Sequence, residues 1–239
     1  MIGRVVAFVC LAVLSTVSAA SANCRQALAL GLDVSGSVDL REYRLQLDGV
    51  VAALNHPEVK HLLFATASAP VSLLVYEWSG PTDQRVLVPW TQVTTLEDLE
   101  QINGLLALTT RRDAAPGTAL GQAMLVGAQL LGQKSSCWKR TLDISGDGHS
   151  NLGPRPRDVR AQIEREDITI NGLVIGSDSL VGADRRQSDI AELTAYFQTE
   201  VIVGPDGFVQ TALGFEAYAE AMTAKLKREL QGVVIGELQ

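Results

Sequence analysis

Residues 27–37, Ala-Leu-Ala-Leu-Gly-Leu-Asp-Val-Ser-Gly-Ser, form an apolar run that ends in oxygen-bearing side chains. A run this short, with no charge before Asp33, is typical of a strand buried on both faces of a parallel sheet. Asp33, Ser35 and Ser37 alternate at the carboxyl end of that strand, where open α/β sheets bind ligands, so an extended backbone turns their oxygens to one side. One carboxylate and two hydroxyls form a surface suited to a hard cation such as Mg²⁺. The alternative is that these residues only cap the next helix, a frequent use of Asp and Ser.

Helix and strand signals alternate along the rest of the chain. Asp39 and Glu42 form a capping box ahead of apolar residues at helical spacing. An antiparallel partner at 85–90 follows a strand at 71–78 so closely that it belongs at a sheet edge, where Pro89 is tolerated. Further strands are expected at 140–145, 168–175 and 200–203, and helices at 40–54, 58–65, 94–108, 119–131, 157–166, 189–197 and 215–230. The pattern predicts an α/β fold with a doubly wound, mostly parallel sheet of about six strands, one of them an antiparallel edge strand, and helices on both faces.

Length and charge narrow the classes of partner. The 239 residues are enough for one sizeable core, and the formal net charge of −7 argues against nucleic acid or an anionic membrane surface. The basic pairs Arg111-Arg112 and Arg185-Arg186 are expected to be solvated surface.

The first 22 residues resemble a secretory signal peptide. Arg4 precedes an apolar stretch at 5–17, and Ala20-Ser21-Ala22 is a small-residue cleavage site. Cleavage after Ala22 would leave one domain, 23–239, in the periplasm or secreted. The apolar stretch is short for a membrane span, and no later segment is long enough for one. A lipid anchor at Cys24 is the alternative, although Asn23 fits such a site poorly.

Two cysteines, Cys24 and Cys137, remain after the signal peptide with its Cys10 is removed. In an oxidising compartment a pair predicts one disulfide. Each cysteine precedes an expected strand, so the two thiols meet if those strands are parallel neighbours. Two free thiols are the alternative.

Two further residues fall where they would join the oxygen cluster. Thr118 precedes the small-residue helix at 119–131, and Asp147 directly follows the strand at 140–145. Taken alone, Thr118 reads as a helix cap and Asp147 as a turn residue between Gly146 and Gly148. Asp143, four residues before Asp147, is expected to be a structural buried carboxylate if it faces inward.

The set Asp33, Ser35, Ser37, Thr118 and Asp147 resembles the metal-ion-dependent adhesion site of the von Willebrand factor type A domain, over nearly the whole mature chain and in element order. The segments 76–80 and 145–148, Cys24 and Cys137-Trp138 further resemble a bacterial family of exported single-domain members of unknown function.

The resemblance implies a role for each residue. Ser35 and Ser37 bind the cation through their hydroxyls, and Thr118 binds it directly or through water. Asp33 and Asp147 act partly through water and hold the hydroxyls in place. An open coordination position would attract a carboxylate from a protein partner, with Mg²⁺ as the cation and Mn²⁺ as a substitute. A monomer is expected when the partner is absent.

Other functions fit less well. In a structural accessory domain the metal would only stabilise the loops. A haloacid-dehalogenase-type phosphatase needs a second carboxylate two residues after its nucleophile, where this chain has Ser35. A serine hydrolase needs a Gly-x-Ser-x-Gly turn and a partnered histidine, and His149 has no evident partner. The three tryptophans, Trp78, Trp90 and Trp138, are expected to pack in the core or at its edge. A non-enzymatic binding domain is therefore the prediction.

Overall fold

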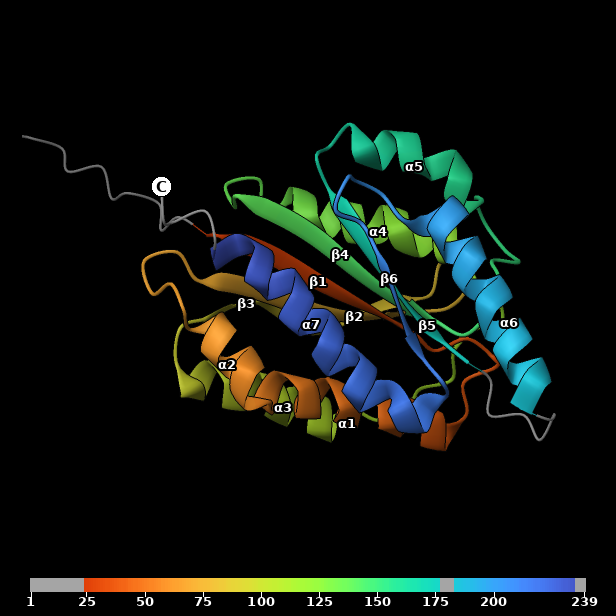
Figure 1. The fold of residues 1–239 in the computed structure, drawn as a ribbon, viewed down its shortest axis with the longest axis horizontal. Helices are drawn as coiled ribbons and strands as arrows, with labels where there is room; N and C mark the ends of the chain where they lie inside the picture. Colours follow the sequence, from red (N-terminus) through yellow and green to blue (C-terminus); the bar gives the residue numbers. More distant parts are fainter. Residues whose placement is uncertain (1–23, 177–182, 235–239) are drawn as a thin grey trace, which may run out of the picture.

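The computed structural model describes residues 24–176 and 183–234, with side chains described for 24–176 and 187–231. Six strands form one sheet between two layers of helices (Figure 1). The expected signal peptide and the pair Arg185-Arg186 lie outside the part whose side chains are described. Among the described helices, none has both the length and the apolar character needed to span a membrane.

The strand order is β3-β2-β1-β4-β5-β6, and among these described strands only β2 and β3 pair antiparallel. The predicted doubly wound sheet with one antiparallel edge strand is therefore confirmed. The strands are β1 (Gln26–Asp33), β2 (Val71–Trp78), β3 (Gln84–Val93), β4 (Lys139–Gly146), β5 (Thr169–Ile175) and β6 (Val209–Ala212).

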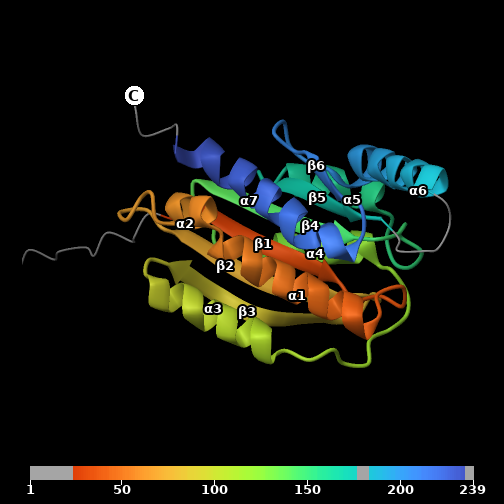
Figure 2. The ribbon, with the colours of Figure 1, turned by 60° about the horizontal axis from the view of Figure 1, so that its bottom comes forward.

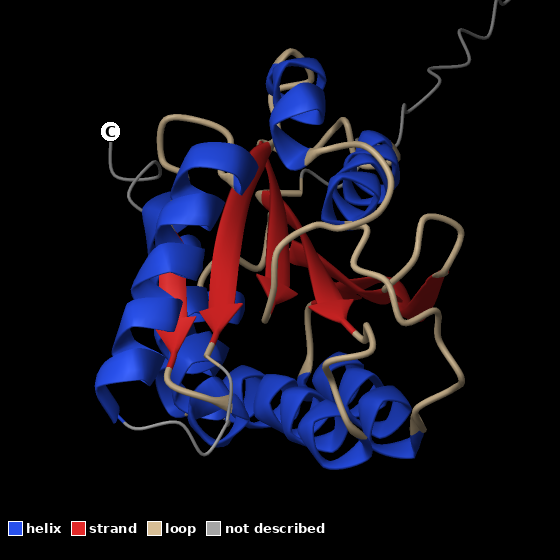
Figure 3. Cartoon of the chain, turned by 90° about the vertical axis from the view of Figure 1, so that its right-hand side faces the viewer, coloured by secondary structure: helices blue, strands red, loops and turns tan. Residues whose placement is uncertain are grey.

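The helices divide between the two faces of the sheet (Figures 2 and 3). One layer holds α1 (Leu40–Asn55), α2 (Pro57–Leu63), α3 (Leu96–Leu108) and α7 (Tyr218–Val234). The other holds α4 (Leu120–Gly132), α5 (Pro156–Glu164) and α6 (Ala183–Tyr196), which continues into a π-helical turn, Phe197–Val201. Each layer buries its own apolar cluster against the sheet.

The central strand β1 is buried along its whole length. Leu28, Leu30 and Leu32 belong to the cluster on the α1 side, whereas Ala27 and Ala29 belong to the cluster on the α4 side. Large side chains on one face and small ones on the other let α4 approach the sheet closely. Gly127 of α4 shows how close this approach is, because a Cβ there would lie 2.7 Å from Leu142 of β4.

The last strand lies later in the chain than predicted. Residues 200–203 were expected to form it, but Glu200 and Val201 complete the π-helical turn, and Val203 makes only an isolated bridge to Ile170. The chain then reverses at Gly204, whose φ is +88°, and β6 pairs with β5. The prediction failed because residues 201–203 are as buried and apolar as a strand, while the true strand is half-buried and polar at an edge.

A disulfide joins Cys24 to Cys137 across 113 positions of sequence. The Trp138 backbone N–H donates to the Cys24 carbonyl, so the bond lies where β1 and β4 begin to pair. The predicted arrangement of the two cysteines before parallel neighbouring strands is present. A sulfur in this bond cannot also carry the thioether of a lipid anchor. Trp138 itself is 54% exposed, which contradicts its expected place in the packing, whereas Trp78 is fully buried.

Candidate metal centre

Asp33 ends β1 with its side chain turned back onto the following loop. Its Oδ1 accepts a hydrogen bond from the Ser35 backbone N–H at 2.8 Å, and its backbone carbonyl accepts one from Gln46 Nε2 at 2.9 Å. The next helix, α1, is capped by Asp39, which accepts from the Glu42 N–H in the predicted capping box. The interpretation of Asp33, Ser35 and Ser37 as caps of that helix is therefore wrong.

Asp147 reaches this loop from the end of the neighbouring strand β4. The Ser37 hydroxyl donates to Asp147 Oδ1 at 2.8 Å, and the Ser35 and Ser37 hydroxyls are 3.2 Å apart. Parallel pairing of β1 with β4 brings the two strand ends together. Four of the five predicted residues are thus linked by hydrogen bonds at the carboxyl edge of the sheet, Asp33 through the Ser35 backbone N–H and the others through side-chain oxygens.

Thr118 comes to the same edge through backbone contacts. The Gly36 N–H donates to the Pro116 carbonyl at 3.0 Å, and a Cβ on Gly36 would lie 3.0 Å from that oxygen. Asn151, which follows Asp147 in its loop, accepts from the Thr118 N–H through Oδ1 at 2.9 Å. The Thr118 side chain does not cap α4, and within the described residues it makes no hydrogen bond to the other four.

The two carboxylates lack a compensating charge. Asp33 is fully buried, and its Oδ2 has no hydrogen-bond partner. Burial raises the pKa of Asp33 to about 7, and the charge of Asp147 adds to the shift. Burial likewise raises the pKa of Asp147. A bound cation would remove this cost, and the set fits a hard cation because every side-chain donor is an oxygen.

The described part of the chain offers the candidate cation no alternative cluster of nitrogen, sulfur and carboxylate ligands. Among the described residues, no group of three or more His, Cys, Asp or Glu side chains could hold a metal ion. A metal held at this edge would therefore depend on the hydroxyls of Ser35, Ser37 and Thr118 as well as on the two carboxylates. Ser37 is exposed and Asp147 half-buried, so solvent reaches the cluster.

Sequence analysis missed the side chains that hold the surrounding loops. Arg111 donates through Nη2 to the Val34 and Ser35 carbonyls at 3.3 and 3.4 Å, and Arg112 Nε lies 2.8 Å from the buried Glu77 Oε1. Arg112 also pairs with Asp83. The expectation that Arg111 and Arg112 are solvated surface is therefore wrong. The sequence feature that could have revealed the Arg112 contact is Glu77. It is an acidic residue in an otherwise uncharged strand, and its buried carboxylate needs a cation from another segment.

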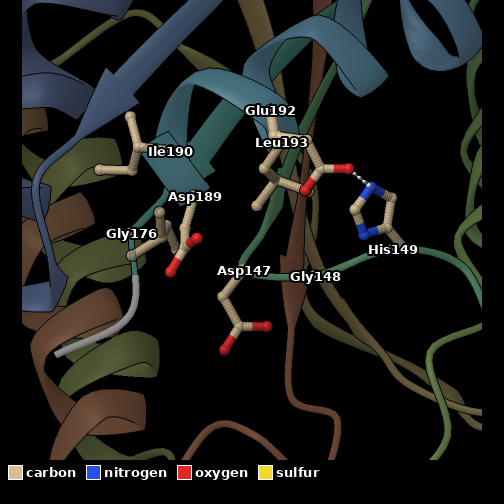
Figure 4. Close-up of a pocket in the computed structure, with 9 residues that line it drawn as sticks. Asp147, Gly148, His149, Gly176, Asp189, Ile190, Glu192 and Leu193 are labelled. Carbon is tan, nitrogen blue, oxygen red and sulfur yellow. Dashed lines mark ion pairs between the residues drawn. The ribbon is translucent and has the colours of Figure 1, made fainter. Parts of the chain in front are cut away.

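A cavity of about 140 Å³ opens beside Asp147, between the loop after β4 and α6 (Figure 4). His149 does have a partner there, contrary to the prediction. Its Nε2 lies 3.4 Å from Glu192 Oε1, and its ring packs edge-on against Tyr196. Figure 4 shows the ring turned toward Glu192 rather than toward Asp147. His149 therefore packs with α6 and does not serve as a base for Ser35.

Solved structures that this fold resembles include a von Willebrand factor type A domain and a mussel byssus protein. Proximal thread matrix protein 1 from the mussel byssus, in a form with a zinc-occupied MIDAS motif, matches with a TM-score of 0.57 at 18% identity over 87% of this chain and 48% of that one. A von Willebrand factor type A domain from Catenulispora acidiphila matches with a TM-score of 0.54 at 15% identity over 87% of this chain and 43% of that one.

An aerotolerance-related membrane protein from Bacteroides fragilis matches with a TM-score of 0.53 at 12% identity. That match covers 84% of this chain and 98% of the other. The chain spans only about half the length of the mussel structures that it matches.

These likenesses show the fold: the chain has the fold of a von Willebrand factor type A domain, as the sequence resemblance implied. No curated protein matches the sequence. A family model does match, over residues 23–234, which is most of the chain. This protein belongs to the family described as protein of unknown function DUF1194.

Proposed function

We propose that this chain is an exported, non-enzymatic protein-binding domain that captures a partner's carboxylate at a divalent cation. Asp33, Ser35, Ser37, Thr118 and Asp147 would hold the cation, with Mg²⁺ preferred and Mn²⁺ able to replace it. When bound, the cation supplies a positive charge with a coordination position open to an acidic side chain. The observation that carries the proposal is the fully buried Asp33, with an unpartnered oxygen beside a second carboxylate.

The surface around the candidate site supports a protein as the partner. Leu40 at the start of α1, Leu152 in the loop after β4 and Leu213 after β6 are 73%, 46% and 70% exposed. All three lie on segments at the carboxyl edge of the sheet. Exposed apolar side chains near a polar centre are typical of a surface that another protein covers. The occurrence of a zinc-occupied MIDAS motif in the mussel protein adds support by fold analogy.

Calorimetric titration of the mature, metal-stripped protein with MgCl₂ and MnCl₂ tests the cation. We expect one saturable site, and we expect Ser35→Ala and Asp33→Ala to weaken it by at least tenfold while circular dichroism shows a folded domain. Ser72→Ala is the matched control, because Ser72 is a fully buried serine of β2 whose hydroxyl has no partner. Normal affinity in Asp33→Ala would remove that residue from the site.

Repeating the titration in sodium acetate, with sodium chloride at equal ionic strength as control, separates binding from a structural role. Acetate stands in for the partner's carboxylate. If the cation keeps an open position, acetate tightens Mg²⁺ binding. If the metal only stabilises the loops, acetate changes nothing while EDTA lowers the melting temperature. Failure to bind Mg²⁺ or Mn²⁺ with or without acetate would contradict the proposal, and turnover of a phosphate ester would point to the phosphatase alternative.

A further inference from the structure

A second, larger cavity lies at the amino edge of the sheet, opposite the candidate metal centre. Its volume is about 640 Å³, and it is lined by the starts of β4 and β5, by the loop before β6 and by α7. Lys139 begins β4 at the cavity, and Asp147 follows the same strand at the other edge. Eight strand residues separate the two places by roughly 25 Å at the usual rise per residue. Occupants of the two sites cannot touch one another.

Glu229 of α7 gives the cavity an unsatisfied acceptor. It is 1% exposed, and its Oε1 already accepts from Asn171 Nδ2 at 2.6 Å and from Lys225 Nζ at 2.7 Å. Its Oε2 is buried with no hydrogen-bond partner. Asn171 also lines the cavity and is 1% exposed, so these two buried residues form its inner wall. An unpaired buried carboxylate oxygen is costly unless a donor reaches it.

The charges behind this wall do not balance. The buried carboxylates of Asp143 and Glu229 lie 2.8 and 2.7 Å from a single ammonium, that of the fully buried Lys225. A single cation thus serves two carboxylates, so one negative charge is in excess at a pH where both are ionised. The charged side chains at the rim do not change this balance, because the cations Lys139 and Arg228 are matched by the anions Asp167 and Asp206.

The rim cation nearest in sequence does not neutralise Glu229. The Arg228 guanidinium lies 3.8 Å from the centre of the Phe208 ring, a cation–π contact. Among the ion pairs of the described residues, none joins Arg228 to Glu229. A cation that enters the cavity would therefore meet a carboxylate that no rim cation occupies.

The cavity suits an organic cation rather than a bare metal ion. Mg²⁺ and Ca²⁺ need six or more oxygens, and the inner wall offers one free carboxylate oxygen. An ammonium group needs only a few acceptors and can donate directly to that oxygen. The indole of Trp138, 54% exposed on the rim, offers a flat apolar face for the rest of such a molecule.

We propose that this cavity binds a small organic amine whose ammonium group donates to Glu229 Oε2 and whose apolar body packs on Trp138. The site is independent of the candidate metal centre, since it uses the other edge of the sheet and other residues. It would give the domain a small-molecule ligand in addition to a protein partner.

Three probes of the same size and different charge test the proposal on the full mature protein saturated with MgCl₂. Benzylamine carries the ammonium, benzyl alcohol is neutral and benzoate is an anion that would favour Lys139 and Arg228. Calorimetry and Trp138 fluorescence measure binding. We expect benzylamine to bind at least tenfold more tightly than either other probe. No binding of benzylamine, or tighter binding of benzoate, would overturn the proposal.

Single-residue variants test where the ammonium group of the ligand binds. Glu229→Gln is isosteric and keeps an acceptor for Asn171 and Lys225, but it places an N–H₂ donor where the ammonium should bind, so benzylamine affinity should fall at least tenfold. Arg228→Gln is the control, because removing a like charge should leave that affinity unchanged or raise it. Trp138→Ala, at an exposed position that tolerates truncation, should weaken benzylamine severalfold. Unchanged affinity in Glu229→Gln or in Trp138→Ala would overturn the assignment, and Asp33→Ala should bind benzylamine normally.

Discussion

Asp33 and Asp143 are both buried carboxylates on neighbouring central strands, but their surroundings differ. Asp143 lies 2.8 Å from the Lys225 ammonium on α7. Asp33 faces Asp147, and its free oxygen has no partner. The same residue type at the same depth is thus structural in one case and available to an added cation in the other. Asp143 therefore fits the expected role of a structural buried carboxylate, and it does not compete for the candidate metal.

The pKa of Asp143 predicts how stability depends on pH. Burial raises this pKa from 3.8 to about 7, and the charge of Glu229 adds to the shift although Lys225 opposes it. An acid with a raised pKa in the folded state contributes stability that is fully present below its unfolded pKa and is lost as pH rises through the folded pKa. The contribution of Asp143 should therefore disappear as pH rises from about 4 through about 7.

Asp143→Asn cannot titrate and leaves Lys225 paired with Glu229. Relative to the natural protein, this variant should gain stability as pH rises between those limits. Urea unfolding of both proteins at several pH values measures the difference, from which the shared titration of Asp33 cancels. A constant difference across this pH range would show that Asp143 does not titrate there.

At the scale of elements, Arg112 holds the loop between α3 and α4 against the sheet through ion pairs with Glu77 and Asp83. Arg112 Nε lies 2.8 Å from Glu77 Oε1, and Glu77 is fully buried in β2. Replacing Arg112 with Ala leaves that carboxylate with the Tyr43 hydroxyl at 2.7 Å and with Arg85 at 3.8 Å. We expect a loss of about 2 kcal/mol, the usual value for a hydrogen bond to a charged group. The larger cost of breaking a fully buried ion pair does not apply, since the Arg112 side chain is 32% exposed.

Denaturant unfolding of Arg112→Ala checks this value. Arg112→Lys keeps the charge but loses the planar fork that serves Glu77 and Asp83 together, so its stability should be intermediate. If the alanine and lysine variants were equally stable, the positive charge would contribute nothing at this position.

Elements with strong local signals were predictable from the sequence. The helix α1 has a capping box and a clear apolar stripe. The run that ends at Asp33 carries no charge before that residue, as expected for a strand that is buried along its whole length. The strand β6 was missed because an edge strand is only half-buried, so its polar residues carry no strand pattern. The local sequence pattern indicates burial rather than strand structure: the buried apolar residues Val201, Ile202 and Val203 form the end of a π-helical turn and the segment after it.

Only part of the candidate site could be predicted from the sequence. Residues at the ends of β1 and β4 could be placed because parallel neighbours share an edge, and the structure joins Ser37 to Asp147 by a hydrogen bond. Arg111, Gln46 and Asn151 could not be placed in this way. They act through backbone carbonyls and amides of distant segments, which no residue type or spacing in the sequence reveals.

At the scale of the whole molecule, the disulfide and the candidate metal centre both link β1 to β4, from opposite edges of the sheet. Cys24 and Cys137 join the segments where the two strands begin, and Ser37 and Asp147 meet just beyond the point where they end. The two strands are therefore held at one end by a covalent bond that restricts the unfolded chain. At the other end, the proposed cation would stabilise only the folded state.

The disulfide should therefore account for a large part of the stability of the metal-free domain. It spans 113 positions, and the chain-entropy model assigns a loop of this length about 4–5 kcal/mol. The double variant Cys24→Ser, Cys137→Ser should unfold at a much lower denaturant concentration. Its unfolding should also depend more steeply on denaturant, because the uncrosslinked chain expands and exposes more surface.

Reduction of the natural protein with dithiothreitol should reproduce both changes, and the double serine variant should not respond to the reductant. Mass spectrometry without reductant checks that Cys24 and Cys137 are joined. Free thiols at Cys24 and Cys137 would contradict the pairing. A lower midpoint with an unchanged slope would place the effect in the folded state, where the start of β1 would have lost its alignment with β4.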